Sequence, residues 1–180
     1  ETTATYDPRT GEFVINTPHE TAGKEYIGNA LHGSMGVVFA QLFTQNKCYG
    51  VHAILVPLRD EKGEVLPGIR VEDNGYKMGL NGVDNGKIWF DNVRVPRENL
   101  LDRFGQVDAS GVYHSEIKSD NKRFFTMLST LVAGRIVVAL ASISASKVAL
   151  TIAVKYGLKR RQFGPKEGAN TSALAAELAA

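Results

Sequence analysis

Cysteine is almost absent from this chain: Cys48 is the single one among 180 residues. One cysteine excludes an intrachain disulfide, so we expect a reducing compartment and a fold that is held together by a hydrophobic core. The hydrophobic residues, 43% of the total, are sufficient for such a core. We predict that Cys48 is a small buried side chain and not a nucleophile.

An excess of either charge is also lacking. The 21 basic and 19 acidic residues leave a net charge of +2, which argues against a general nucleic-acid binder, because such proteins usually carry a marked basic excess. We therefore expect no nucleic-acid partner. The histidines have no spacing typical of metal ligands, so we predict no metal site. They are His19, His32, His52 and His114.

An uninterrupted apolar run of membrane-spanning length is missing. The most apolar segment, residues 131–156, is interrupted by Arg135 and Lys147 and diluted by serines. A spanning helix needs about 20 mostly apolar residues. We therefore predict a buried helix of a soluble protein and no membrane span.

Proline is scarce in the second half: apart from Pro165, every proline lies at or before Pro96. The first half instead alternates β-rich runs with turn signals, which favours an antiparallel sandwich or barrel. The runs are EFVINT, GVVFAQLF, GVHAILVPL and GKIWFDNVRV. Residues 6–13 read as a hairpin turn and residues 59–68 as an exposed turn, and Asn85-Gly86 predicts a turn before a strand.

From residue 119 the pattern becomes helical. Ser119 or Asp120 can cap a helix start, and apolar residues then recur at helical spacing. A continuous helix over 122–160 would be roughly 55–60 Å long, so we expect it to pack in a bundle or against a neighbouring subunit. We predict an α+β fold: a β domain over 1–103, a polar connector over 104–118, and the start of a helical domain over 119–180.

The sequence LKRRQFGP, residues 158–165, closes this helical segment. Lys159, Arg160 and Arg161 suit a helix C-terminus, and Gly164-Pro165 would end the helix. The same arginines could also clamp a phosphate, because a guanidinium offers paired donors to pyrophosphate oxygens. Both interpretations can hold together.

Three motifs, which occur in the same order along the chain as in a known superfamily, resemble that superfamily. KRRQFG (159–164) resembles the Arg-x-x-Phe-Gly motif of the acyl-CoA dehydrogenase and oxidase superfamily. KEYIGN (24–29) resembles its Lys-x-Trp-Ile-Thr-Asn strand, and residues 78–101 resemble the strand pair that closes its β domain, including a Val-Pro-x-Glu-Asn signature. The resemblance covers nearly the whole chain and is closest to the acyl-CoA oxidases.

The resemblance implies FAD as cofactor and fatty acyl-CoA as substrate. Tyr26, Ile27 and Gly28 match the segment beside the flavin ring. Arg160 matches an arginine that reaches the FAD pyrophosphate of the partner subunit, with Gln162 and Phe163 as its companions. Arg135 matches an arginine near the nucleotide portion of acyl-CoA. A homodimer that shares FAD across its interface is therefore expected.

The implied reaction is α,β-dehydrogenation of fatty acyl-CoA to trans-2-enoyl-CoA in β-oxidation, with O₂ reduced to H₂O₂ and a peroxisomal location. Gly28, where dehydrogenases usually carry Thr or Ser, and the long connector favour an oxidase. The alternatives are an acyl-CoA dehydrogenase that passes electrons to a carrier flavoprotein, in the mitochondrion, and a non-catalytic interaction module of the same fold.

No catalytic residue is nominated. The family's glutamate lies well beyond the Arg-x-x-Phe-Gly motif, Glu177 is too close to that motif, and the other position known in the family falls near Gly134, which has no side chain. The strand that usually precedes residue 1 also carries flavin contacts. We therefore expect a fragment that is inactive alone.

Overall fold

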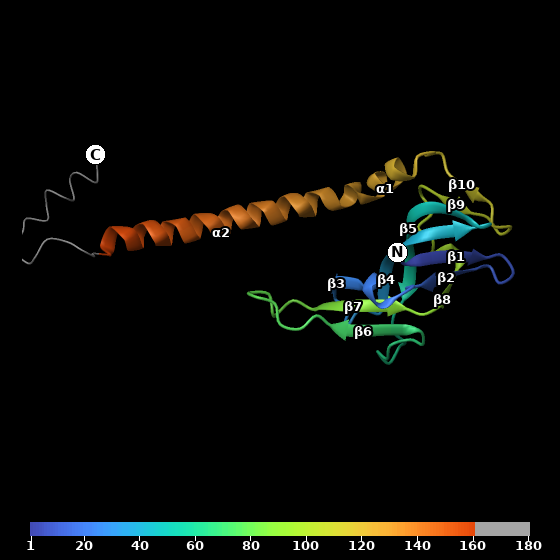
Figure 1. The fold of residues 1–180 in the computed structure, drawn as a ribbon, viewed down its shortest axis with the longest axis horizontal. Helices are drawn as coiled ribbons and strands as arrows, with labels where there is room; N and C mark the ends of the chain where they lie inside the picture. Colours follow the sequence, from blue (N-terminus) through green and yellow to red (C-terminus); the bar gives the residue numbers. More distant parts are fainter. Residues whose placement is uncertain (161–180) are drawn as a thin grey trace, which may run out of the picture. The chain divides into compact units, whose positions relative to one another are not determined.

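The computed structural model describes residues 1–160. By its internal contacts the chain divides into two units, Glu1–Ser129 and the chain from Thr130 onward. The first unit carries the strands and one helix, and the second carries a long helix (Figure 1). This content confirms the predicted α+β class.

The strands, in chain order, are β1 (Thr3–Asp7), β2 (Glu12–Asn16), β3 (Lys24–Gly28), β4 (Met35–Thr44), β5 (Lys47–Pro57), β6 (Ile69–Asp73), β7 (Asn85–Phe90), β8 (Val93–Pro96), β9 (Gln106–Val107) and β10 (Tyr113–His114). The helices are α1 (Asp120–Leu128), α2 (Val132–Lys159) and the short 3₁₀ turns Glu20–Ala22, Arg97–Asn99 and Ser129–Leu131.

The strands form a five-stranded sheet ordered β5-β4-β1-β2-β8, a three-stranded sheet ordered β3-β7-β6, and the small pair β10-β9. Most neighbours are antiparallel, as predicted, but β1 and β4 pair in parallel, with Thr3 opposite Gln41. The purely antiparallel prediction is therefore wrong at this pair. Between β2 and β4 the chain crosses to the other sheet through β3, and this crossover lets β4 return parallel to β1.

Two of the three predicted turns are confirmed. Between β1 and β2 the amide of Gly11, which has φ +71°, donates to Asp7 O at 2.9 Å. Residues 59–68 are largely exposed, and the Asp60 carboxylate accepts the amides of residues 62 and 64, both at 2.9 Å.

Asn85-Gly86 is not a turn, and that prediction is wrong. Both residues lie inside β7. A Cβ at Gly86 would meet Glu72 O at 2.7 Å and Ala30 Cβ at 2.8 Å, so glycine is needed here for the close approach of β6 and of the loop after β3.

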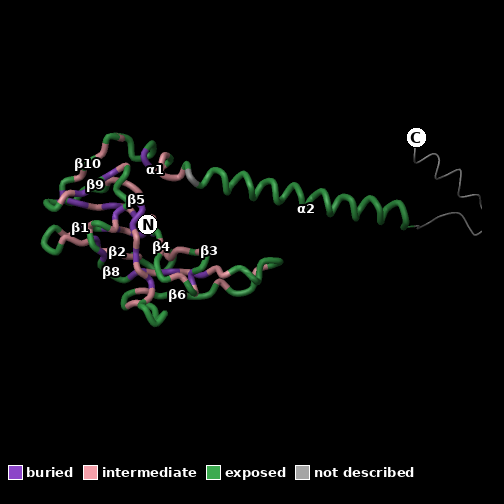
Figure 2. Tube along the Cα trace, turned by 180° about the vertical axis from the view of Figure 1, so that it is seen from behind, coloured by how far each residue is buried: buried purple, intermediate pink, exposed green. Residues whose placement is uncertain are grey.

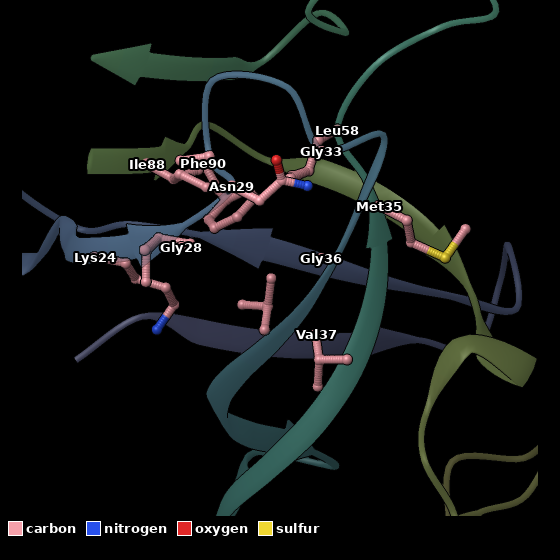
Figure 3. Close-up of a pocket in the computed structure, with 13 residues that line it drawn as sticks. Lys24, Gly28, Asn29, Gly33, Met35, Gly36, Val37, Leu58, Ile88 and Phe90 are labelled. Carbon is pink, nitrogen blue, oxygen red and sulfur yellow. The ribbon is translucent and has the colours of Figure 1, made fainter. Parts of the chain in front are cut away.

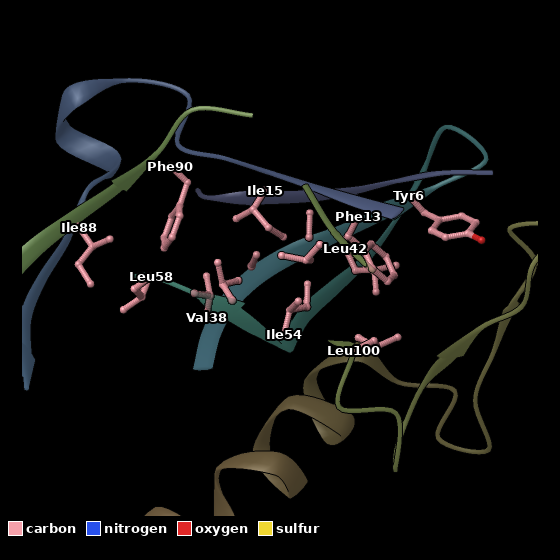
Figure 4. Close-up of a cluster of buried hydrophobic side chains, with 14 of the residues drawn as sticks. Tyr6, Phe13, Ile15, Val38, Leu42, Ile54, Leu58, Ile88, Phe90 and Leu100 are labelled. Carbon is pink, nitrogen blue, oxygen red and sulfur yellow. The ribbon is translucent and has the colours of Figure 1, made fainter. Parts of the chain in front are cut away.

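Side chains from the five-stranded and the three-stranded sheets fill one core (Figure 4). Alternate residues of β2 and β4 point into it, which is why Phe13 and Ile15 are fully buried while Val14 between them is not. Ile88 and Phe90 of β7, each at most 3% exposed, join the same cluster from the three-stranded sheet.

The predicted connector folds back onto the five-stranded sheet through a polar cluster. Tyr113 Oη lies 2.9 Å from Nε2 of His52, which is 1% exposed, and the Tyr113 ring stacks on Tyr49 with centroids 4.1 Å apart. Arg123 of α1 donates to Tyr49 O and to Asp120 Oδ1, the latter at 2.6 Å. These contacts hold α1 on β5. They also bury Arg123, which is 2% exposed.

The helical segment is not continuous, contrary to prediction. Ser119 caps α1 as expected, with its hydroxyl accepting the amide of Lys122 at 3.4 Å. The α-helix then gives way to the 3₁₀ turn Ser129–Leu131, where Ser129 Oγ donates to Thr126 O at 2.7 Å. Serine and threonine hydroxyls that compete for backbone carbonyls weaken a helix at such a point. The predicted Gly164-Pro165 stop lies outside the described residues.

The expected burial of the long helix is not found within residues 1–160. All of α2 is exposed (Figure 2). By length and composition alone α2 could cross a membrane, but a core helix of a soluble protein passes the same test, so one such helix is weak support for a span. Burial needs a partner surface, which the periodicity of one segment does not reveal.

Cys48 is exposed, so the prediction of a buried thiol is wrong. It is the second residue of β5, close to the β4–β5 turn, where Gln45 and Asn46 have φ values of +49° and +60°. The alternation of β5 brings residues into the core only further along the strand.

Phe13→Ala should lower the free energy of unfolding by about 3–5 kcal/mol, because it empties a fully buried site. The exposed Phe125 offers a matched control: Phe125→Ala should cost less than about 1 kcal/mol. Urea unfolding followed by fluorescence of Trp89, the single tryptophan, measures both. Equal losses in the two variants would contradict the assigned core.

Stability should fall as the pH drops below about 6.5, because burial lowers the pKa of His52 from its usual 6.5. Below that pH the unfolded chain binds a proton that the folded chain excludes, so protons favour unfolding. Urea midpoints between pH 5 and 7 measure the slope. His52→Gln should flatten it, and an unchanged slope in that variant would refute this origin.

Candidate functional site

The strand β3, which carries the predicted flavin-side residues, is an edge strand of the three-stranded sheet. It pairs with β7, but the register shifts between Lys24 and Ile27. Tyr26 sits in this bulge with φ +56°, and the residue is 67% exposed. The bulge therefore turns an aromatic ring outward at the edge of the sheet.

Gly28 is open toward its missing side chain. A Cβ at this position would meet no atom within 4 Å, and its φ lies outside the left-handed range. Neither packing within residues 1–160 nor backbone strain therefore requires glycine here, in contrast to Gly86. The open backbone leaves room for a flat group to approach β3 closely.

The loop after β3 is fixed by two charged residues. The Asp84 carboxylate accepts the amide of Leu31 at 3.2 Å and lies 2.9 Å from His32 Nδ1. The hydrogen bond from His32 holds the pKa of Asp84 below its usual value. Arg59 Nη1 donates to two loop carbonyls, Ala30 O at 3.0 Å and Gly33 O at 2.7 Å. The loop is thus held by one residue that follows β5 and one that precedes β7.

A cavity of about 310 Å³ lies between β3, this loop and β4 (Figure 3). Its lining combines three glycines with apolar side chains from both sheets, among them Ile27, Val38 and Leu58. The lining residues Met35 and Val37 are 56% and 51% exposed. Such a cavity suits a flat, largely apolar ring system that needs few polar partners.

Lys24 is the one charged residue that lines this cavity. Its Nζ donates to Phe39 O of β4 at 2.7 Å, and burial lowers the pKa of the amine. Sequence reasoning quoted Lys24 inside the motif but did not nominate it. Its partner is a backbone carbonyl fifteen positions away, which leaves no trace in the sequence.

The predicted site residues fall into separate groups. Tyr26, Ile27 and Gly28 lie together on β3, in the first unit. Arg135 and Arg160 belong to the second unit and are exposed; Arg160 caps α2, with its amide on Tyr156 O at 2.8 Å and Nη1 donating to Tyr156 Oη at 3.1 Å. Gln162 and Phe163 lie outside the described residues.

Comparison with curated proteins gives close relatives of one kind, whereas no family model matches the chain. Over 93% of its length the chain is 51% identical to the acyl-coenzyme A oxidase-like protein of Mus musculus, and over 91% it is 49% identical to the peroxisomal acyl-coenzyme A oxidase 3 of Arabidopsis thaliana. The matches cover 26% and 24% of those proteins, so the chain spans about a quarter of their length.

Solved structures agree with this result. Arabidopsis thaliana acyl-CoA oxidase 1 matches 92% of the chain with a TM-score of 0.78 and 40% identity, and the match covers 25% of that protein. Caenorhabditis elegans acyl-CoA oxidase-2, solved with FAD, ascaroside-CoA and ATP, matches 94% with a TM-score of 0.76 and 37% identity, over 25% of its own length. Sequence and fold thus identify the chain as a homologue of the acyl-CoA oxidases that corresponds to about a quarter of their length.

Proposed function

We propose that the chain is a segment of an FAD-dependent acyl-CoA oxidase that converts fatty acyl-CoA to trans-2-enoyl-CoA and reduces O₂ to H₂O₂. The observation that carries this proposal is the identity of about half, over nine-tenths of the chain, to one relative named an acyl-CoA oxidase-like protein and to another named a peroxisomal acyl-CoA oxidase. We extend the peroxisomal location and a role in fatty acid β-oxidation to this protein on the same basis.

The edge of β3 fits a flavin. Gly28 leaves open space where a ring could approach the backbone, Tyr26 presents an exposed aromatic face, and the adjoining cavity is mostly apolar. In the proposed assignment Tyr26 and Ile27 pack against the ring, while Gly28 offers backbone groups alone. When bound, FAD supplies the redox chemistry, and the protein supplies binding and orientation.

The remaining contacts are proposed from the second unit and beyond it. Arg160, with Gln162 and Phe163, would hold the FAD pyrophosphate of a partner subunit in a homodimer. Arg135 would bind the nucleotide portion of acyl-CoA. The carboxylate that removes the α-proton is proposed to lie in a part of the protein outside these 180 residues, so we assign no catalytic residue here and propose that the segment alone does not turn over.

A second candidate is an acyl-CoA dehydrogenase that passes its electrons to a carrier flavoprotein. Gly28 argues against it, because a glycine offers the flavin no hydroxyl where dehydrogenases usually carry Thr or Ser. A non-catalytic dimerising module of the same fold is the third candidate.

Peroxide release under air separates the three candidates. The full-length protein that carries this chain, loaded with FAD and given palmitoyl-CoA without an electron carrier, should release H₂O₂, while the 180-residue segment should not. Turnover that appears only with an artificial electron acceptor would contradict the oxidase proposal in favour of a dehydrogenase. If no turnover of palmitoyl-CoA is seen with or without an acceptor, the non-catalytic module remains as the candidate.

Arg160→Ala in the full-length protein should weaken FAD retention, because one charged hydrogen-bonding partner of the pyrophosphate is lost. The expected cost is about 1.5–3 kcal/mol, or roughly ten- to a hundredfold in Kd. Arg161→Ala is the matched control and should have a smaller effect. Flavin content after gel filtration measures both. If both variants retain as much flavin as wild type, the proposed clamp is refuted.

A further inference from the structure

Lys24 stands apart from the other lysines of the described β sheets by its surroundings. It is the one charged group in a cavity otherwise lined by glycine, asparagine and apolar residues, and within residues 1–160 its Nζ has one hydrogen-bond partner, the carbonyl of Phe39. No ion pair within 4 Å joins it to a carboxylate of the described chain. A partly buried ammonium that lacks a counter-charge is unfavourable unless something else stabilises it.

The neighbouring charges do not supply that counter-charge. Glu25, the next residue on β3, lies 3.1 Å from Lys87 of β7 and is exposed. None of the other residues that line the cavity, from β3, β4, β7 or the loop after β3, carries a titratable group. Lys24 is therefore a half-buried cation beside an open, mostly apolar space.

A cation without a carboxylate partner in such a space stabilises negative charge that forms next to it. An electrostatic interaction is stronger in a water-poor site than in bulk solvent, so a preorganised ammonium stabilises charge that develops during a reaction. The lowered pKa of Lys24 also makes its ammonium a readier proton donor than that of an ordinary lysine.

We propose that Lys24 supplies the positive charge that assists the reduction of O₂ at this site. This inference rests on the proposed function, because it needs reduced flavin against β3. Reduction of O₂ to H₂O₂ takes two electrons and two protons. Bound reduced flavin, as its anion, would supply both electrons and one proton, and the second proton would come from solvent or from the Lys24 ammonium, which solvent then reprotonates. The products are oxidised flavin and H₂O₂. Lys24 stabilises the negative charge that forms on oxygen when the first electron arrives.

A purely structural role for Lys24, as a tie between β3 and β4, predicts a different result. Loss of the tie would disturb flavin binding and both halves of the reaction alike. A charge acting on oxygen affects the oxidative half selectively and depends on the protonation of the amine. The two halves must therefore be measured separately.

The experiment uses the full-length protein loaded with FAD. The flavin is reduced anaerobically with palmitoyl-CoA, or with dithionite, and then mixed with O₂ in a stopped-flow spectrometer while the flavin absorbance is recorded. Lys24→Met should slow reoxidation by about ten- to a hundredfold and leave the rate of reduction by palmitoyl-CoA within about twofold of wild type. Lys24→Arg should restore most of the reoxidation rate.

Lys87→Met is the matched control, since Lys87 lies on the paired strand and has a carboxylate partner. It should reoxidise at the wild-type rate. Wild-type reoxidation by Lys24→Met, or equal slowing of both half-reactions, would overturn the inference. Failure of palmitoyl-CoA to reduce the wild-type flavin would instead count against the proposed function, and the dithionite arm would still report on Lys24. Absence of bound flavin would overturn both.

The wild-type protein provides a second readout that needs no variant at Lys24. Its reoxidation rate should fall as the pH rises through the pKa of Lys24, which lies below the usual 10.5, because deprotonation removes the charge. Lys24→Arg should move this fall to higher pH. A flat profile in wild type would contradict the role of the ammonium.

Discussion

The packing of the three-stranded sheet against the five-stranded sheet is the interaction on which the position of the edge strand β3 depends. Ile88 and Phe90 of β7 enter the same core as Phe13 and Ile15 of β2, and Phe90 O accepts the amide of Thr17 at 2.7 Å. Because β7 is fixed there, its partner β3 is held at the edge, where the sheets leave a cavity between β3 and β4. The core thus determines where Gly28 and Lys24 stand.

Two cations of the first unit, the buried Arg123 and the half-buried Lys24, have opposite surroundings. The guanidinium of Arg123 donates hydrogen bonds to three acceptors: the carbonyls of Tyr49 and Ile117 and the carboxylate of Asp120. These partners compensate the charge of Arg123, because an uncompensated buried charge is costly, although its Nε has no hydrogen-bond partner in the described part of the chain. Lys24 has one carbonyl and an open cavity. The contrast supports a structural role for Arg123 and a role in reactivity for Lys24.

Local patterns allowed much of the fold to be predicted, whereas long-range pairing did not follow from them. The β-rich run EFVINT predicted the strand β2, and Ser119, one of two predicted caps, marks the start of α1. The parallel pairing of β1 with β4 depends on a crossover that no local pattern shows, and Asn85-Gly86 has turn chemistry but serves close packing. Tyr26, Ile27 and Gly28 were nominated by motif resemblance; Lys24 was missed as a candidate because its environment exists only after β3 and β4 come together.

The open edge at Gly28 is the proposed place of the flavin ring. The most direct test is an experimental structure of the full-length protein with FAD bound. The flavin ring should lie in van der Waals contact with the backbone of Ile27 and Gly28, within about 4 Å, with the Lys24 cavity beside it. A ring bound elsewhere, with the edge of β3 covered by polypeptide, would contradict it.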